Sequence, residues 1–227
     1  MIIKETYYLG TVTIDSYTTS CCFFTMLQNT FLHIPYVNER TEQKLWENNV
    51  HCWDDFLQRK QVMSNHQLIH NYVHLSKQAY DNKNHNFFST RLLSKYHWRA
   101  YPDYQGNCCF LDIETTGLDK HRNSITLVGM YNGKETKIFE QGKMHGFEEE
   151  IQQYAYIVTF NGSLFDLPFI KAKFPELVFN HFHADLRWML RSLGYTGGLK
   201  KIEQQLNITR NADVRGITGK DAVKLWY

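Results

Sequence analysis

The stretch that decides the fold is residues 108–118, CCFLDIETTGL. Residues 108–114 predict a buried strand that ends in two acids, Asp112 and Glu114, and a glycine-containing loop follows at once. Residues two apart on a strand point to the same face, so both carboxylates leave the strand together. Neighbouring carboxylates raise each other's pKa, and a hard divalent cation relieves that conflict. The pair therefore predicts a Mg2+ or Mn2+ site, whereas an isolated Asp-x-Glu would indicate only a solvated strand edge.

A second acidic segment lies downstream, in residues 160–169, FNGSLFDLPF. The strand predicted at 156–160 ends at Asn161, and Asp166 falls in the first turn of the next predicted helix. Helix-start electrostatics alone favour an acid at that position. An acid there also points toward the end of the first strand, so the three carboxylates together predict a two-metal site.

Outward from these segments, the chain after Pro102 alternates between strands and helices. Asn132-Gly133 is a strong hairpin signal between two apolar runs. Strands are predicted at 108–114, 124–131, 135–140, 156–160 and near 177–183, and helices at 147–154, 164–174, 185–193 and 199–206. Early strands in hairpins followed by alternating helices and strands predict an α/β fold with a mixed sheet and flanking helices.

The first half of the chain differs in composition and in predicted secondary structure. Residues 1–27 are rich in Thr, Tyr and β-branched residues, which favours strand, and we predict that they form an extension of unknown role. We expect residues 1–25 to be dispensable for folding of the following domain. Residues 28–104 predict a mostly helical region, with Thr41 as a helix N-cap and a short helix over 87–101 that stops at Pro102.

Composition narrows the function classes only slightly. Hydrophobic residues make up 43% and charged residues 21% of the 227 residues, and the net charge is +2. This balance is ordinary for a globular protein and neither requires nor excludes nucleic acid as a partner. The five cysteines are odd in number and lack zinc-finger spacing, which indicates a reducing, cytoplasmic setting. We expect no membrane span, because no apolar run is long enough.

Both acidic segments belong to recognisable motifs. LDIETTGL (111–118) and TFNGSLFDLPFI (159–170) resemble the first and second motifs of the DEDD superfamily of 3′→5′ exonucleases. Segments 183–187 and 197–203 resemble its YprB-type ribonuclease-H-like branch. The resemblance covers roughly residues 105–227 and implies a ribonuclease-H-like domain there. It also implies a metal-dependent 3′→5′ exonuclease that acts on single-stranded ends of DNA or RNA.

The resemblance also implies roles for individual residues. Asp112 would bridge two metal ions, and Glu114 and Asp166 would each complete one. The loop would hold the terminal nucleotide, with Leu118 against its base. The candidate substrate-binding residues are Thr115, Thr116, Gly117, Leu118, Asn161, His183, Asp185 and Lys200.

Two of these candidates and one group of histidines leave alternatives open. Asp185 fits a polar pair with His183 and a helix N-cap equally well. Lys200 fits a phosphate contact or a solvated helix face. His66, His70 and His74 recur every four residues, but no carboxylate or cysteine lies near them, so we favour an exposed polar face over a metal clasp.

Two departures from the family pattern matter. The superfamily closes its site with a fourth acid in a Tyr-x-x-x-Asp or His-x-x-x-Asp pattern on a final helix, and neither that pattern nor that helix is found. Asp213 and Asp221 are the acids in that part of the chain. We therefore expect one metal ion to bind well and the second weakly, with Mn2+ preferred to Mg2+ and slow or no cleavage. The alternative function is a catalytically impaired nucleic-acid-binding protein.

The second departure lies in residues 30–58, which resemble a degenerate helix-hairpin-helix, a unit whose hairpin amides grip a nucleic-acid backbone. Its expected Gly-x-Gly is Tyr36-Val37-Asn38 here. A structural helical cap for the following domain explains the segment equally well.

Overall fold

The structure, a computed structural model, describes residues 27–209. The predictions for residues 1–26, for Asp213 and Asp221 and for a final helix lie outside these residues. No helix in the described part is both long and apolar enough to cross a bilayer.

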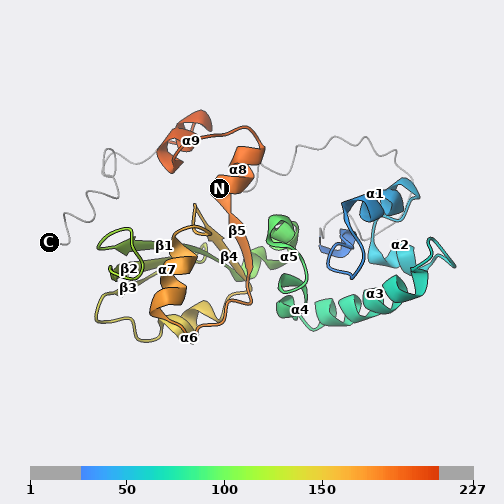
Figure 1. The fold of residues 1–227 in the computed structure, drawn as a ribbon, viewed down its shortest axis with the longest axis horizontal. Coiled ribbons are helices and arrows are strands. Elements are labelled where there is room, and N and C mark those ends of the chain that lie inside the picture. Colours follow the sequence, from blue (N-terminus) through green and yellow to red (C-terminus); the bar gives the residue numbers. More distant parts are fainter. Residues whose placement is uncertain (1–26, 210–227) are drawn as a thin grey trace.

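A five-stranded mixed sheet forms the centre of the second half of the chain. Its strands are β1 (Cys108–Thr115), β2 (Ile125–Tyr131), β3 (Thr136–Glu140), β4 (Tyr156–Thr159) and β5 (Phe182–Asp185). The spatial order is β3-β2-β1-β4-β5: β1, β2 and β3 pair antiparallel, and β4 and β5 continue parallel to β1. This arrangement confirms the predicted ribonuclease-H-like α/β fold (Figure 1).

Local sequence explains most of these elements. The hairpin between β2 and β3 turns at Asn132-Gly133, where Gly133 has a φ of +90° that a glycine adopts without strain. The predicted strand near 177–183 begins only at Phe182. β4 is four residues long and pairs with Phe182–Asp185 alone, so earlier residues have no strand to pair with.

Helices connect and flank the strands. In this half of the chain they are α6 (Phe147–Ile151), α7 (Asp166–Lys173), α8 (Leu186–Ser192) and α9 (Leu199–Gln205). One face of the sheet packs against α6 and α7, with Leu111, Val128, Phe147 and Phe169 among the buried side chains. Cys109 is buried there as a small apolar side chain.

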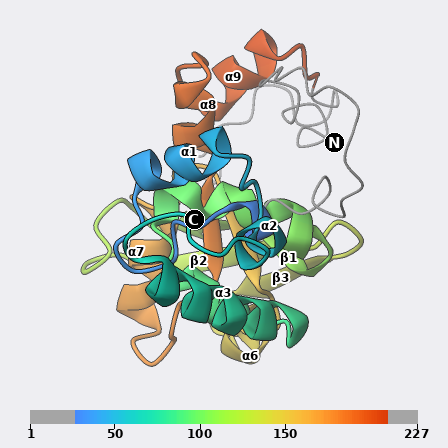
Figure 2. The same cartoon turned by 90° about the vertical axis from the view of Figure 1, so that its right-hand side faces the viewer.

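The preceding region is helical, as predicted. Its elements are η4 (Leu27–Asn29), α1 (Glu39–Glu47), α2 (Trp53–Leu57), α3 (His66–Asp81), α4 (His85–Ser89), η5 (Ser94–Ala100), α5 (Tyr101–Tyr104) and η6 (Gln105–Asn107). Figure 2, turned by 90°, shows α1, α2 and α3 on the side that faces the viewer.

Two predictions about helix ends were wrong. The N-cap of α1 is Asn38, whose side chain accepts a hydrogen bond from the Thr41 amide, because Thr41 already lies in the first helical turn. Pro102 does not stop a helix but lies in the first turn of α5. A proline is tolerated there because that amide would have no helical acceptor.

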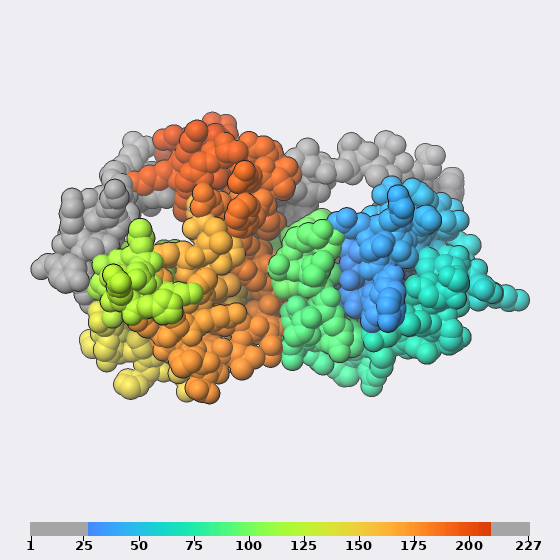
Figure 3. All heavy atoms as spheres, in the orientation of Figure 1, coloured from blue at the N-terminus to red at the C-terminus, as the bar shows by residue number. Residues whose placement is uncertain are grey.

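The helical region and the sheet share one buried cluster. Trp53, Phe88 and Ala100 of the helical region belong to the same cluster as Tyr156 and Phe182 of the sheet. The Tyr156 hydroxyl donates to the carbonyl oxygen of His97 at 3.1 Å, and the His183 amide donates to Nδ1 of His97 at 2.9 Å. The helical region therefore covers the sheet face opposite α6 and α7, over β4 and β5 (Figures 1 and 3).

Candidate functional site

The two acids of β1 lie on the face that the helical region covers only in part. Cys108 and Phe110 on this face pack against the shared cluster, and beyond them Asp112 is exposed and Glu114 half-buried. Gly129 of β2 stands directly opposite Asp112 in the antiparallel pair. Because opposite residues project to the same face, the glycine itself places no side chain beside Asp112, and the nearest side-chain atom to a Cβ on Gly129 would be Cδ2 of Leu127 at 3.8 Å.

Asp166 approaches the same strand from a different element. It is the first residue of α7, is 3% exposed, and its Oδ1 accepts a hydrogen bond from the amide of Ile113 at 3.1 Å. Ile113 lies between Asp112 and Glu114. The hydrogen bond therefore brings the third predicted carboxylate to the stretch of β1 that carries the other two.

All three carboxyl groups have raised pKa values. Partial desolvation by the surrounding protein raises the pKa of Asp112, although its side chain still reaches the surface, and desolvation together with the charge of Asp112 raises the pKa of Glu114. Burial first, and then the negative charge of Asp112, raises the pKa of Asp166 to about 7. Within residues 27–209, none of the three forms an ion pair with a cationic side chain. Among the described residues, backbone hydrogen bonds stabilise the charged forms of Asp112 and Asp166, but no cationic side chain stabilises any of the three groups.

This donor set fits a hard divalent cation. Mg2+ and Mn2+ prefer carboxylate oxygens, and a cation relieves both the burial cost and the repulsion that raise these pKa values. Across the described residues, no three acid, imidazole or thiol side chains already converge as a formed metal cage. Asp112, Glu114 and Asp166 are therefore the residues that could hold such an ion by the chemistry of their donors.

The turn before Asp166 is tightly built. Asn161 has a φ of +68°, a left-handed conformation that asparagine tolerates. A Cβ on Gly162 would lie 2.3 Å from Oγ1 of Thr159, so only glycine fits. The Thr159 hydroxyl also contacts Nε2 of His183 at 2.9 Å, and burial lowers the pKa of His183 to about 4.

Asp185 binds this turn to the next helix. It caps α8 by accepting from the Arg187 amide at 3.1 Å, so the N-cap interpretation is confirmed. Its carboxylate also accepts from the amides of Asn161 at 2.7 Å and Ser163 at 3.0 Å, and it is 7% exposed. The bonds from the Asn161 and Ser163 amides were not predicted from the sequence, because 22 to 24 residues separate the partners.

The loop after β1 folds back on itself. The hydroxyl of Thr115 donates to the Gly117 carbonyl at 2.7 Å, and Thr116 Oγ1 accepts from the Ser124 amide at 3.0 Å. A Cβ on Gly117 would lie 2.6 Å from Oδ1 of Asn123, which explains the glycine. Leu118 at the end of this loop is 86% exposed.

A hollow separates this loop from the start of α7. Its lining residues are Leu118, Asp119, Lys120, His121, Ser163, Leu164, Phe165, Pro168 and Phe169. The two segments lie side by side, yellow-green and orange, in Figure 3. Of the predicted substrate-binding residues, only Leu118 lines the hollow, but its two walls flank Glu114 and Asp166 in sequence. The hollow is apolar on the α7 side and carries Lys120 on the loop side.

The remaining candidates lie elsewhere. Lys200 is half-buried on α9. Tyr36 is 84% exposed and has a φ of +64° at the position of the expected hairpin glycine. The imidazole rings of His70 and His74 lie 4.6 Å apart between centroids, and those of His66 and His70 6.0 Å apart. His74 is exposed, but His66 and His70 are half-buried and the His66 ring stacks on Phe56 at 4.7 Å between centroids, so the predicted exposed polar face is only partly present.

Comparisons with known proteins place this geometry in a family. Residues 109–227 match the RNase_H superfamily, and curated proteins provide no match. Among solved structures, the family B DNA polymerase of the archaeon Pyrobaculum calidifontis is similar at 16% identity and a TM-score of 0.44 over 52% of this chain and 20% of the polymerase.

NrnC of Brucella melitensis is similar at 19% identity and a TM-score of 0.39, over 55% of this chain and 67% of NrnC. Its form with bound pGG is similar at 17% identity and a TM-score of 0.37, over 55% of this chain and 66% of that one. The chain thus spans a small part of the polymerase and about two thirds of NrnC. The superfamily match covers the sheet with all three acids, and the chain belongs to the RNase H superfamily.

Proposed function

We propose that the protein is a metal-dependent nuclease, a 3′→5′ exonuclease of the YprB-type branch of the DEDD superfamily, acting on single-stranded ends of DNA or RNA. One observation carries the proposal: Asp112, Glu114 and Asp166 come from two elements to one stretch of β1 with raised pKa values and, among the described residues, no cationic partner. Membership of the RNase H superfamily supports a nuclease.

The three acids have the following proposed roles. Asp112, Glu114 and Asp166 would hold the metal ions. Ions bound there would supply the charge needed to activate a water molecule and to stabilise the leaving 3′ oxygen, so no protein nucleophile is needed. Because the Asp166 carboxylate accepts from the Ile113 amide, its orientation relative to β1 is set before any ion binds. This preorganisation lowers the cost of assembling the site.

The hollow between the loop after β1 and the start of α7 provides a place for the terminal nucleotide. Leu118 offers an apolar contact to the base from one wall, and Phe165 lines the other. Lys120 on the same rim is placed to compensate phosphate charge. The hydrogen bonds of Thr115 and Thr116 hold the loop that carries Leu118, and Lys200 is proposed to contact the chain further along.

A second candidate function is nucleic-acid binding without efficient cleavage. The observation that favours it is that no three donors converge into a formed cage within residues 27–209. In that case the same hollow would bind a strand end, and the second metal ion would bind too weakly for rapid hydrolysis.

One assay separates the two candidates. Single-stranded DNA and RNA oligonucleotides, labelled at either end, are incubated with Mg2+, with Mn2+ or with a chelator. We expect stepwise shortening from the 3′ end that requires metal and that Asp112→Asn abolishes, while Asp81→Asn, an exposed acid at the end of α3, leaves it unchanged. Tight binding without shortening in either metal would favour the second candidate, and release from the 5′ end would contradict the proposed direction.

A further inference from the structure

Helix α8 carries an aromatic and basic face next to the site. Arg187, Trp188 and Arg191 are all exposed, with Trp188 46% exposed. Residues three and four apart lie on one side of a helix, so Arg191 neighbours both of the others. The Arg191 guanidinium lies 5.7 Å from the centroid of the Trp188 ring. We call these three side chains the α8 face; the helix that carries them directly follows β5 (Figure 1).

The α8 face is fixed to the turn that leads into Asp166. Nε1 of Trp188 donates to Oγ of Ser163 at 3.1 Å, and Nη1 of Arg187 donates to Oδ1 of Asn161 at 2.5 Å. Ser163 also lines the hollow. The buried carboxylate of Asp185 accepts from the amides of Asn161, Ser163 and Arg187, so turn and helix are tied together. The Trp188 ring is therefore held next to the hollow.

The two arginines of the α8 face, Arg187 and Arg191, have no carboxylate partner among the described residues. The indole N–H of Trp188 is already satisfied by Ser163, which leaves the ring itself as the available contact surface. A positively charged surface around an aromatic platform is the combination that binds single strands with little sequence preference.

We propose that the α8 face is a second subsite for single-stranded nucleic acid, in which a base upstream of the terminal nucleotide stacks on Trp188 while Arg187 and Arg191 contact phosphates. The inference rests on the proposed function, because the hollow must hold the strand end. A strand that leaves the hollow past Ser163 meets the Trp188 ring next. The subsite would make affinity depend on strand length and would hold a longer substrate in place between successive cleavages.

The test measures binding in the Asp112→Asn background, which prevents cleavage, with 5′-labelled single-stranded oligonucleotides of one to eight nucleotides and Mn2+ present. Stacking on one aromatic ring changes affinity by about 5- to 150-fold. We expect Trp188→Ala to weaken binding of the longer oligonucleotides by a factor in this range and to leave binding of the mononucleotide unaffected. The Trp188→Phe variant should retain most of the wild-type affinity. Arg187→Ala and Arg191→Ala should each lower the slope of log affinity against log salt by about 0.7.

Arg59→Ala is the matched control, an exposed arginine just after α2 in the helical region, and should change neither affinity nor slope. Equal affinities of the wild-type and Trp188→Ala proteins at every length would overturn the inference while leaving the proposed nuclease function intact. An equal loss for the mononucleotide would also overturn it, because the substitution would then act on the hollow. Tighter binding of an acidic peptide than of an eight-nucleotide strand would show that the α8 face serves a protein partner instead.

Discussion

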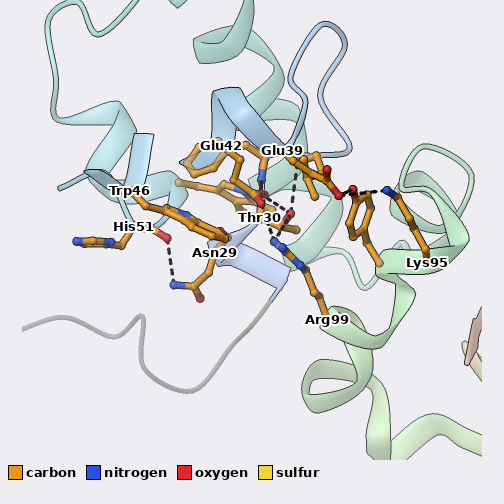
Figure 4. A network of polar contacts seen from close by, with 12 residues as sticks. Asn29, Thr30, Glu39, Glu42, Trp46, His51, Lys95 and Arg99 are labelled. Carbon is orange, nitrogen blue, oxygen red and sulfur yellow. Dashed lines mark hydrogen bonds and ion pairs between the residues drawn. The ribbon is translucent and has the colours of Figure 1, made fainter. Parts of the chain in front are cut away.

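The helical region and the sheet region each bury a carboxylate, and they do so in opposite ways. In the helical region, Glu42 is 1% exposed and accepts from the Thr30 hydroxyl at 2.7 Å and the Phe31 amide at 2.8 Å. Arg99 donates to its other oxygen at 2.8 Å and to Thr30 at 3.1 Å (Figure 4). The charge is fully compensated by neighbours.

In the sheet region, Asp166 is 3% exposed and accepts from the backbone amide of Ile113, but it has no cationic partner among the described residues. Its nearest charged neighbours are acids, so its pKa rises to about 7. A compensated buried charge specifies structure, whereas an uncompensated cluster costs stability and is kept where something else must bind. This difference distinguishes the candidate site from the rest of the core.

The largest effect is expected on hydrolysis. Asp112→Asn and Asp166→Asn should each lower metal-dependent cleavage by about three orders of magnitude or more, because each removes an anionic ligand whose ion stabilises the transition state by several kcal/mol. The measurement is the rate of shortening of a labelled strand at saturating Mn2+. Glu42→Gln should leave the cleavage rate of its folded fraction within a few fold of wild type. A loss of rate as large as that of the Asp112 and Asp166 variants would mean that Glu42 contributes to catalysis and not only to the structure of the helical region.

The second prediction concerns the ion pair between Glu42 and Arg99. Glu42→Gln removes the anion and leaves the Arg99 guanidinium, 16% exposed, without its partner. We expect a loss of about 3–5 kcal/mol in the free energy of unfolding, as for other broken buried pairs. Chemical denaturation at pH 7 measures it. The double variant Glu42→Gln with Arg99→Met should recover part of the loss, and no recovery would assign the effect to the hydrogen bonds with Thr30 and Phe31 instead.

The third prediction concerns the uncompensated acid in metal-free protein. The pKa of Asp166 is raised from 3.8 to about 7 in the folded state, so ionisation penalises folding increasingly as pH rises through that range. Asp166→Asn removes the penalty and still accepts from Ile113. We expect it to stabilise the metal-free protein at pH 8 by up to about 4 kcal/mol and to have little effect near pH 3.5. Destabilisation at pH 8 would show that the carboxylate is compensated after all.

The smallest expected effect is on the pH dependence of stability, and it comes from a buried histidine of the helical region. His33 in the helical region is 3% exposed, and burial lowers its pKa from 6.5 to about 3. Ser76 donates to the Tyr72 carbonyl, so Nε2 of His33 donates to Ser76 and the buried Nδ1 is left with no partner within the described residues. A lowered histidine pKa makes stability fall as pH drops below 6.5.

At pH 5 the loss from His33 should be about 2 kcal/mol relative to pH 7. His33→Leu should reduce this acid dependence, measured as the slope of unfolding free energy between pH 7 and pH 5. The residual slope reports the other buried histidines, among them His183 of the sheet region, whose pKa is about 4. An unchanged slope in His33→Leu would contradict the assignment.

The sequence by itself determined the elements of the second half and the chemistry of its acids. The apolar run of residues 108–111, the Asn132-Gly133 turn and the apolar spacing after Asp166 are local signals, and the structure follows them. It also determined that Asp112 and Glu114 share a face, since that needs only the two-residue period of a strand.

Only the tertiary structure decided where these groups stand relative to one another. The bond from Ile113 to Asp166 spans 53 residues, and the bonds that tie the Asn161 turn to Asp185 span 22 to 24. The glycine opposite Asp112 and the contact of Trp188 with Ser163 depend on strand register and helix placement. Local residue patterns encode the period of a backbone, but such contacts arise only when distant elements pack, because packing is decided by the burial of both partners together.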